Sequence, residues 1–339
     1  VFYIATGVTT ASWSEQARDI QGGGNVATNT AYGTDTLAVN TTGANNTAIG
    51  YQAEDVGTTG SNNTALGSGA LGANSTSSDN TAVGKGALLA NTAADNTAVG
   101  SGALDANVAG TRNVAMGSSA GGAQAGATDH DNTLIGYNAG LLANGSASGG
   151  NTAVGSKALD AAVTSVNATA VGLNALGAST ADGNTAVGSG ALDANVAGVR
   201  NVAVGLDAGG AQAAATDNDN TFVGHNAGLL ANGSASGSNT AVGSLALDAA
   251  VTSIDATAVG KGALSASTAN GNTAVGARAL DVNIAGTRNV AIGVDAGGAQ
   301  AGANDNDNTF VGDNAGLLAN GSASGGNTAV GSKALDAAV

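Results

Sequence analysis

The chain has 339 residues, and its 24 acidic and 9 basic side chains give a formal net charge of −15. This balance argues against nucleic acid and anionic membrane surfaces as partners, because both require clustered Lys and Arg. Cysteine and proline are absent, 56 residues are glycine and only 2% are aromatic, which excludes disulfides, cysteine-based metal sites and a conventional aromatic core. No apolar run is long enough to span a membrane.

Residues 1–28 differ from the rest of the chain. They contain Phe2, Tyr3 and Trp13, and the stretch SEQAR at 14–18 could begin a short helix. Because an open β-edge invites pairing with other edges, repetitive β-structures cover their ends. We therefore predict that residues 1–28 form an N-terminal cap, or alternatively a segment that docks on another copy.

From residue 29 to residue 339 the chain is a repeat array. A five-residue motif, typified by NTAVG, recurs at intervals of 16, 17 or 19 residues, and a larger 88-residue block starts at residues 96, 184 and 272. The eighteen motifs begin at Asn29, Asn46, Asn63, Asn80, Asn96, Asn113, Asn132, Asn151, Ala168, Asn184, Asn201, Asn220, Asn239, Ala256, Asn272, Asn289, Asn308 and Asn327. Such a short period indicates a solenoid.

One repeat of about 17 residues fits one coil of a parallel β-solenoid, with two short strands and two turns. The density of glycine and β-branched residues disfavours helix. We predict an all-β fold of about eighteen coils, and stacking at about 4.8 Å per coil would give a rod roughly 85 Å long.

Alternation along NTAVG at 96–100 places Thr97 and Val99 on one face of the first strand and Asn96, Ala98 and Gly100 on the other. We expect the valine face, together with the leucine of a second strand at 101–106, to form the core. The predicted core residues are Val99, Leu104, Val154, Leu159, Val187, Leu192, Val242, Leu247, Val275 and Leu280.

The opposite face of the first strand carries only small residues, and strands with no polar face are typically buried on both sides. We therefore expect a second copy of the chain to cover this face, as a seam between subunits. The predicted seam residues are Ala98, Gly100, Ala153, Gly155, Ala186, Gly188, Ala241, Gly243, Ala274 and Gly276.

Two columns of polar residues follow from the same alignment. The asparagines are expected to stack as an amide ladder that satisfies backbone groups. The threonines suggest an ice-binding array, but alternation places them with Val99, so we expect a buried or half-buried ladder instead.

Calcium is the one candidate cofactor. The stretches TDHDN (128–132), TDNDN (216–220) and NDNDN (304–308) offer alternating carboxylate and amide oxygens, which Ca²⁺ prefers. They lack the bidentate glutamate of an EF-hand, and Asp and Asn are also ordinary turn residues. The candidate ligands are Asp129, Asp131, Asp217, Asp219, Asp305 and Asp307.

Nothing in the sequence forms a recognisable catalytic set, so we expect no enzyme activity. The two histidines, His130 and His225, occupy different positions in the block, and the only glutamates are Glu15 and Glu54. Three arginines, Arg112, Arg200 and Arg288, occur once per block and are expected either to be solvated or to pair with nearby acids.

The units TTGSNNTALG (58–67), AGTRNVAMG (109–117) and NTAIGYQA (46–53) resemble two families. One is the head repeat of YadA-type trimeric autotransporter adhesins, and the other is the NTAIG-type repeat of phage tail fibres. The resemblance covers the chain from Asn29 onward. It implies a left-handed parallel β-roll that trimerises side by side and displays an attachment surface.

These observations predict an extracellular structural or adhesive fibre, a rigid homotrimeric shaft or head that binds a host-cell surface or matrix ligand by many weak contacts. The alternatives are a virion tail fibre with a receptor-binding role and a self-stacking surface filament. An ice-binding or calcium-binding solenoid is a more distant alternative.

Overall fold

A computed structural model describes residues 26, 28–123, 130–141, 149–161, 164–211, 218–230, 237–249, 253–298, 305–317 and 325–336. The segment 1–28, predicted to be a cap, lies outside these ranges except for residues 26 and 28. The chain divides into two compact units, Val1–Asn151 and Thr152–Val339, and each is described by itself.

Each coil contributes one strand of three residues. In the first unit these are β1 (Thr30–Tyr32), β2 (Thr47–Ile49), β3 (Thr64–Leu66), β4 (Thr81–Val83), β5 (Thr97–Val99), β6 (Val114–Met116) and β7 (Thr133–Ile135). In the second they are β8 (Thr152–Val154), β9 (Thr169–Val171), β10 (Thr185–Val187), β11 (Val202–Val204), β12 (Thr221–Val223), β13 (Thr240–Val242), β14 (Thr257–Val259), β15 (Thr273–Val275), β16 (Val290–Ile292), β17 (Thr309–Val311) and β18 (Thr328–Val330).

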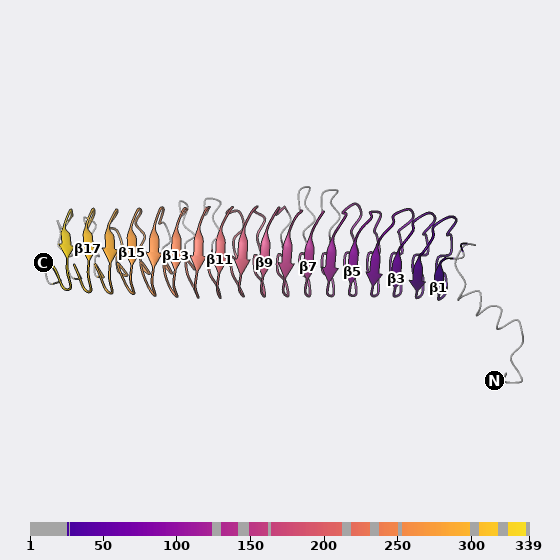
Figure 1. Ribbon diagram of the computed structural model, residues 1–339, viewed down its shortest axis with the longest axis horizontal. Coiled ribbons are helices and arrows are strands. Elements are labelled where there is room, and N and C mark those ends of the chain that lie inside the picture. Colours follow the sequence, from indigo (N-terminus) through magenta and orange to yellow (C-terminus); the bar gives the residue numbers. More distant parts are fainter. Residues whose placement is uncertain are drawn as a thin grey trace, which may run out of the picture. The chain divides into compact units, whose positions relative to one another are not determined.

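Within each unit, successive strands pair in parallel, side by side in chain order (Figure 1). The register never slips, so Thr97 lies beside Thr81 and Val99 beside Val83. The predicted all-β parallel solenoid is therefore confirmed, and the described residues contain no helix. Left-handedness and the trimer stay predictions.

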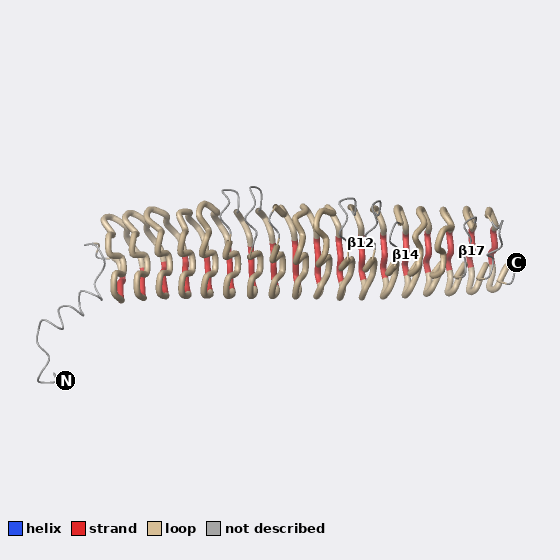
Figure 2. The backbone as a smooth tube through the Cα atoms, turned by 180° about the vertical axis from the view of Figure 1, so that it is seen from behind, coloured by secondary structure: helices blue, strands red, loops and turns tan. Residues whose placement is uncertain are grey.

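The predicted second strand is wrong. Residues 101–106 form a turn, and Figure 2 shows one short strand per coil with the remainder drawn as loop. Gly102 and Leu104 have φ values of 64° and 50°, in the left-handed region. The turn nevertheless joins the coil-to-coil ladder, because Leu104 N donates to Ala120 O at 2.9 Å and Gly102 N donates to Lys85 O at 2.9 Å.

The faces of the strand alternate as expected, but the inward and outward faces are reversed. Ala98 has no exposed surface, whereas Thr97 and Val99 are half-buried and point outward. The same holds for the other predicted pairs: Ala153, Ala186, Ala241 and Ala274 are fully buried, while Val154 is half-buried and Val187, Val242 and Val275 are 37–38% exposed.

The leucines explain this reversal. Leu104, Leu159, Leu192, Leu247 and Leu280 are fully buried, so this half of the predicted core is confirmed. Each of these leucines has a left-handed backbone conformation, which costs a non-glycine residue about 1–2 kcal/mol. Burial of its side chain contributes about 1.5–3 kcal/mol and offsets that cost. With one leucine entering from the turn, the narrow interior has room only for an alanine from the strand.

The seam glycines also serve the chain's own stacking. Gly100, Gly155, Gly188, Gly243 and Gly276 have φ values between 134° and 142°, which favour glycine. A Cβ atom on Gly243 would lie 2.6 Å from Gly260 O in the next coil. These glycines are therefore required by the close approach of successive coils. The alanine part of the predicted seam is wrong, because those alanines are fully buried inside their own coils, and the glycine part stays a prediction.

Some coils exchange the large and small core positions. In β12 the middle residue is Phe222, fully buried where other strands have alanine, and the leucine position of its coil is occupied by Gly228. A Cβ atom on Gly209, one coil earlier, would lie 2.9 Å from Phe222 Cδ2. One phenylalanine therefore fills two glycine gaps, and Phe310 does the same for Gly297 and Gly316.

The asparagine column points inward and forms the predicted ladder. Asn96 Oδ1 accepts from Asn113 N at 3.0 Å, and Asn96 Nδ2 donates to Gly110 O at 2.8 Å. Each side chain thus joins two coils, which satisfies buried backbone groups that water cannot reach.

We expect Phe222→Ala to destabilise the second unit by about 3–5 kcal/mol, because it empties space that two glycines leave open. Gly228→Leu alone will also destabilise it, since a side chain at residue 228 collides with the Phe222 ring. The double variant restores the alanine–leucine arrangement of other coils and should recover part of the loss. Urea unfolding of the three variants measures this, and strictly additive losses would contradict the exchange.

Candidate binding face

The outward residues of the strands form two columns along each unit. We call these columns, the first and third residues of every strand, the T-x-V face. The first residue is Thr in fifteen strands and Val in β6, β11 and β16, and the third is Val, Ile, Leu or Met except for Tyr32 in β1. In-register pairing keeps each column continuous through the seven strands of the first unit and the eleven of the second.

The third-residue column leaves much apolar surface uncovered. Leu66, Met116 and Ile292 are 45%, 49% and 43% exposed, and Val204 is 39% exposed. Scattered exposed apolar residues are normal, but a contiguous apolar surface marks a contact site. In the second unit this column extends over about 48 Å, given ten spacings of about 4.8 Å between its eleven strands.

Charge is absent from the T-x-V face. Neither outward position of the eighteen strands carries an acidic or basic residue, although the chain has a net charge of −15. The acids lie in the turns instead. Burial raises the pKa of Asp105, Asp193 and Asp281, each next to a core leucine, and the nearby Asp207 carboxylate raises that of Asp193 further.

The T-x-V face was missed from the sequence because its valines were assigned to the core. Thr97 shares a face with Val99, as predicted, but that face is turned outward. The expected half-buried threonine ladder is therefore confirmed for most strands, but its stated reason, a shared core face with valine, is wrong. The motif itself indicated which face is buried. Its asparagine and its middle alanine are two residues apart, so they point to the same side of the strand, and a ladder of asparagines bonded to backbone groups belongs inside the coil.

Three of the candidate calcium ligands are paired with arginine. Arg112 donates to Asp131 through Nε at 2.6 Å and Nη2 at 2.9 Å. The same two-bond pairs join Arg200 to Asp219 and Arg288 to Asp307. These guanidinium groups hold the pKa of each aspartate below its usual value.

The predicted pairing of these arginines is thus confirmed. All three pairs are exposed, so each contributes little to stability. A fourth pair, Arg278 with Asp295, was not predicted. Both residues lie two positions after the motif glycine of their coils, and these coils are successive. Aligning the repeats would therefore have predicted the pair from the sequence.

Of the remaining calcium candidates, one lies within the described residues. Asp129 and Asp217 lie outside the described residues, and Asp305 is fully buried, with its backbone oxygen accepting from Asn289 Nδ2 at 2.6 Å. Among the residues with described positions, no three His, Cys, Asp or Glu side chains gather into a group that could hold a metal ion.

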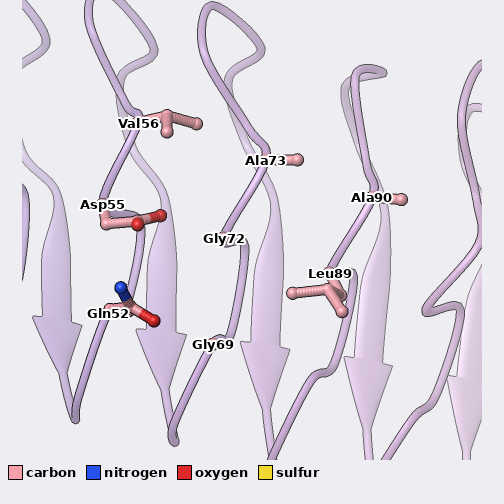
Figure 3. A pocket seen from close by; sticks show the side chains of 8 residues that line it. All are labelled: Gln52, Asp55, Val56, Gly69, Gly72, Ala73, Leu89 and Ala90. Carbon is pink, nitrogen blue, oxygen red and sulfur yellow. The ribbon is translucent and has the colours of Figure 1, made fainter.

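A shallow groove of about 370 Å³ lies on the first unit, outside the T-x-V face. It forms where Gly69 and Gly72 leave space beside Leu89 (Figure 3). The other lining residues are Gln52, Asp55, Val56, Ala73 and Ala90. Its few polar groups do not converge on a point, so the groove does not define a ligand.

Comparison with known protein families, with curated proteins and with solved structures gave no match. Within the described ranges, no helix is long and apolar enough to cross a membrane.

We expect the thermal midpoint of unfolding to be the same in millimolar Ca²⁺ and in excess EGTA, because Asp131, Asp219 and Asp307 already have arginine partners. Differential scanning calorimetry measures this. A midpoint that rises on adding Ca²⁺ and falls again with EGTA would instead support a calcium site in the Asp–Asn stretches.

Proposed function

We propose that the chain is a structural and adhesive fibre protein outside the cell, built as a rigid β-solenoid whose copies pack side by side through their T-x-V faces. The observation that carries this proposal is an apolar, uncharged face that continues through successive strands in a strongly acidic chain. A homotrimer suits a face only two columns wide, since three apolar columns can meet around one axis with the threonines beside them.

Burial of the exposed valines favours such packing. Covering the roughly 40% of each side chain that is exposed contributes on the order of 1 kcal/mol per strand in each copy. Eleven strands in the second unit then contribute about 10 kcal/mol per copy, which is comparable to the 4–15 kcal/mol estimated for lost translational and rotational freedom. Long arrays therefore associate where a few coils would not.

Electrostatics select the same face. Copies with a net charge of −15 repel one another, and the repulsion is smallest where no charged side chain is brought together. Salt screens the remaining repulsion, so association should strengthen as ionic strength rises.

The role that follows is mechanical and multivalent. Parallel copies would present identical turns at each coil, and weak contacts with a host-cell surface or matrix ligand would add as avidity. The resemblance to adhesin heads and phage tail fibres supports this role, for either a cell-surface appendage or a virion fibre. No catalytic step is part of it.

Substitution of the T-x-V face should convert the assembly into monomers. We expect the triple variant Val204→Lys, Val223→Lys, Val242→Lys to have monomeric mass, because it places three cations on adjacent strands of the apolar column. The matched control is Val108→Lys, Val196→Lys, Val282→Lys, whose valines are 41–44% exposed but lie outside the face. Light scattering coupled to size exclusion measures both masses.

The control variant should keep the mass of the unmodified protein, which we expect to be that of a trimer. A monomeric mass for the unmodified chain at physiological salt would reject side-by-side packing. Dissociation of both triple variants would show a general effect of added lysines rather than a specific face.

Ice binding is a second candidate, favoured by the outward threonine column. Threonine hydroxyl and methyl groups repeat at about 4.8 Å along a rigid parallel ladder, a regular spacing that can order surface water. This function needs the T-x-V face uncovered, so it and side-by-side packing exclude each other.

Freezing measurements separate the two candidates. If the unmodified chain is monomeric and delays ice growth, Thr221→Lys, Thr240→Lys, Thr257→Lys should abolish the delay, whereas Thr180→Lys with Thr268→Lys, outside the face, should not. We expect instead an oligomer with no thermal hysteresis, measured by nanolitre osmometry.

A further inference from the structure

One buried carboxyl group lies in the core of the first unit. Glu54 occupies the position that Leu37 and Leu71 hold in the neighbouring coils, with a φ of 47° and no exposed surface. Its backbone N donates to Ala70 O at 2.9 Å, so the coil keeps the usual ladder. A glutamate therefore replaces a core leucine without any change in the path of the chain.

A second exchange accompanies the first. Three residues after the core leucine, neighbouring coils carry a buried asparagine, as at Asn40 and Asn74, but the Glu54 coil carries Gly57. A Cβ atom on Gly57 would lie only 2.8 Å from Glu54 Cγ. The glutamate side chain thus takes the space of an asparagine side chain, and its carboxyl group enters a column of amides.

The hydrogen bonds around this carboxyl lack one donor. Glu54 Oε1 accepts from Asn63 Nδ2 at 2.7 Å, but Glu54 Oε2 is buried with no partner. In the next coil, Asn74 Nδ2 donates to Ser77 O at 2.9 Å, and Asn74 Oδ1 is also buried without a partner. Two unpaired acceptors in adjacent coils carry a free-energy penalty that a single proton would remove.

We propose that Glu54 is a neutral carboxylic acid in the folded chain, that its Oε2–H donates to Asn74 Oδ1, and that its ionisation loosens the coils around it. This effect of Glu54 ionisation acts on the stacking of coils and does not depend on the proposed function.

The electrostatic environment agrees with this assignment. Burial raises the pKa of Glu54 from 4.5 to about 7, and the amides of Asn63 and Asn74 oppose the rise. The ionisable side chains of this and the adjoining coils all retain exposed surface: Tyr32, Asp35, Tyr51, Asp55, Asp79 and Lys85. None of them contributes to the raised pKa of Glu54.

The direction of the pH effect follows from linkage. Between pH 4.5 and 7 the unfolded chain has released the Glu54 proton while the folded chain still holds it, so stability falls as pH rises. Over this interval the folded-to-unfolded ratio of the unit should fall roughly 300-fold because of this one group. The stability that the protonated Glu54 contributes is fully present below pH 4.5 and is lost as the pH rises through about 7.

The chain has only two glutamates, Glu15 and Glu54, which makes the proton directly observable. Selective ¹³C labelling of glutamate carboxyls in the full chain gives two NMR signals, and Glu54→Gln identifies one of them. We expect that signal to titrate near pH 7. Titration of both signals near 4.5 would overturn the proposal.

Two variants test the link to stability. Glu54→Gln keeps the shape and supplies a permanent donor, and Glu54→Leu with Gly57→Asn restores the arrangement of the neighbouring coils. Both should remove the fall in thermal midpoint of the first unit between pH 5 and 8 that the unmodified chain shows. Hydrogen exchange of the Leu71 amide, with that of Leu104 as an internal control, localises the effect.

If the fall persists unchanged in both variants, or if exchange at Leu71 and Leu104 accelerates equally with pH, Glu54 does not control the stacking and the proposal is wrong.

Discussion

The width of the coil interior determines most of this structure. A coil has room for one large core side chain beside a small one, and a larger pair does not fit. When the turn supplies leucine, the strand supplies alanine. When the turn supplies glycine, the strand supplies leucine or phenylalanine, as Leu134 opposite Gly140 shows, or alanine where the phenylalanine of the next coil fills the gap, as at Gly209. Because the strand's larger β-branched residues find no space inside, they face outward and create the T-x-V face.

Polar side chains obey the same limit. The buried asparagines of the motif fit because their side-chain oxygens accept from the backbone N of the next coil, as at Asn80 and Asn96. Where the motif has Ala168 or Ala256, the buried hydroxyls of Ser165 and Ser253 donate to Ser179 O and Ser267 O in the next coil. A lost amide is thus accompanied by a hydroxyl nearby, and the connection between coils is kept.

The sequence was sufficient for the features that depend on periodicity. The motif spacing predicted the parallel solenoid, the alternation grouped Thr97 with Val99, and the recurrence of Arg112 predicted its pairing. The sequence did not reveal which face of the strand points inward. We expected valine to be buried in preference to alanine, which assumes an interior wide enough for large residues from both the strand and the turn. Leu104 in a left-handed turn breaks that assumption, and a positive φ at leucine leaves no trace in composition.

The 88-residue block gains a physical meaning from the Phe222 exchange. Phe222 depends on Gly209 in the coil before it and on Gly228 in its own, so these three residues must be inherited together. The block that begins at residue 184 contains all three, and the block at 272 contains Gly297, Phe310 and Gly316. Duplicating a coil that holds the ring or one of its gaps would separate the two, whereas duplicating the whole block preserves both. Coils with a phenylalanine core are therefore added without damage only as part of a block, whereas alanine–leucine coils, such as those starting at Asn63 and Asn80, can be added singly.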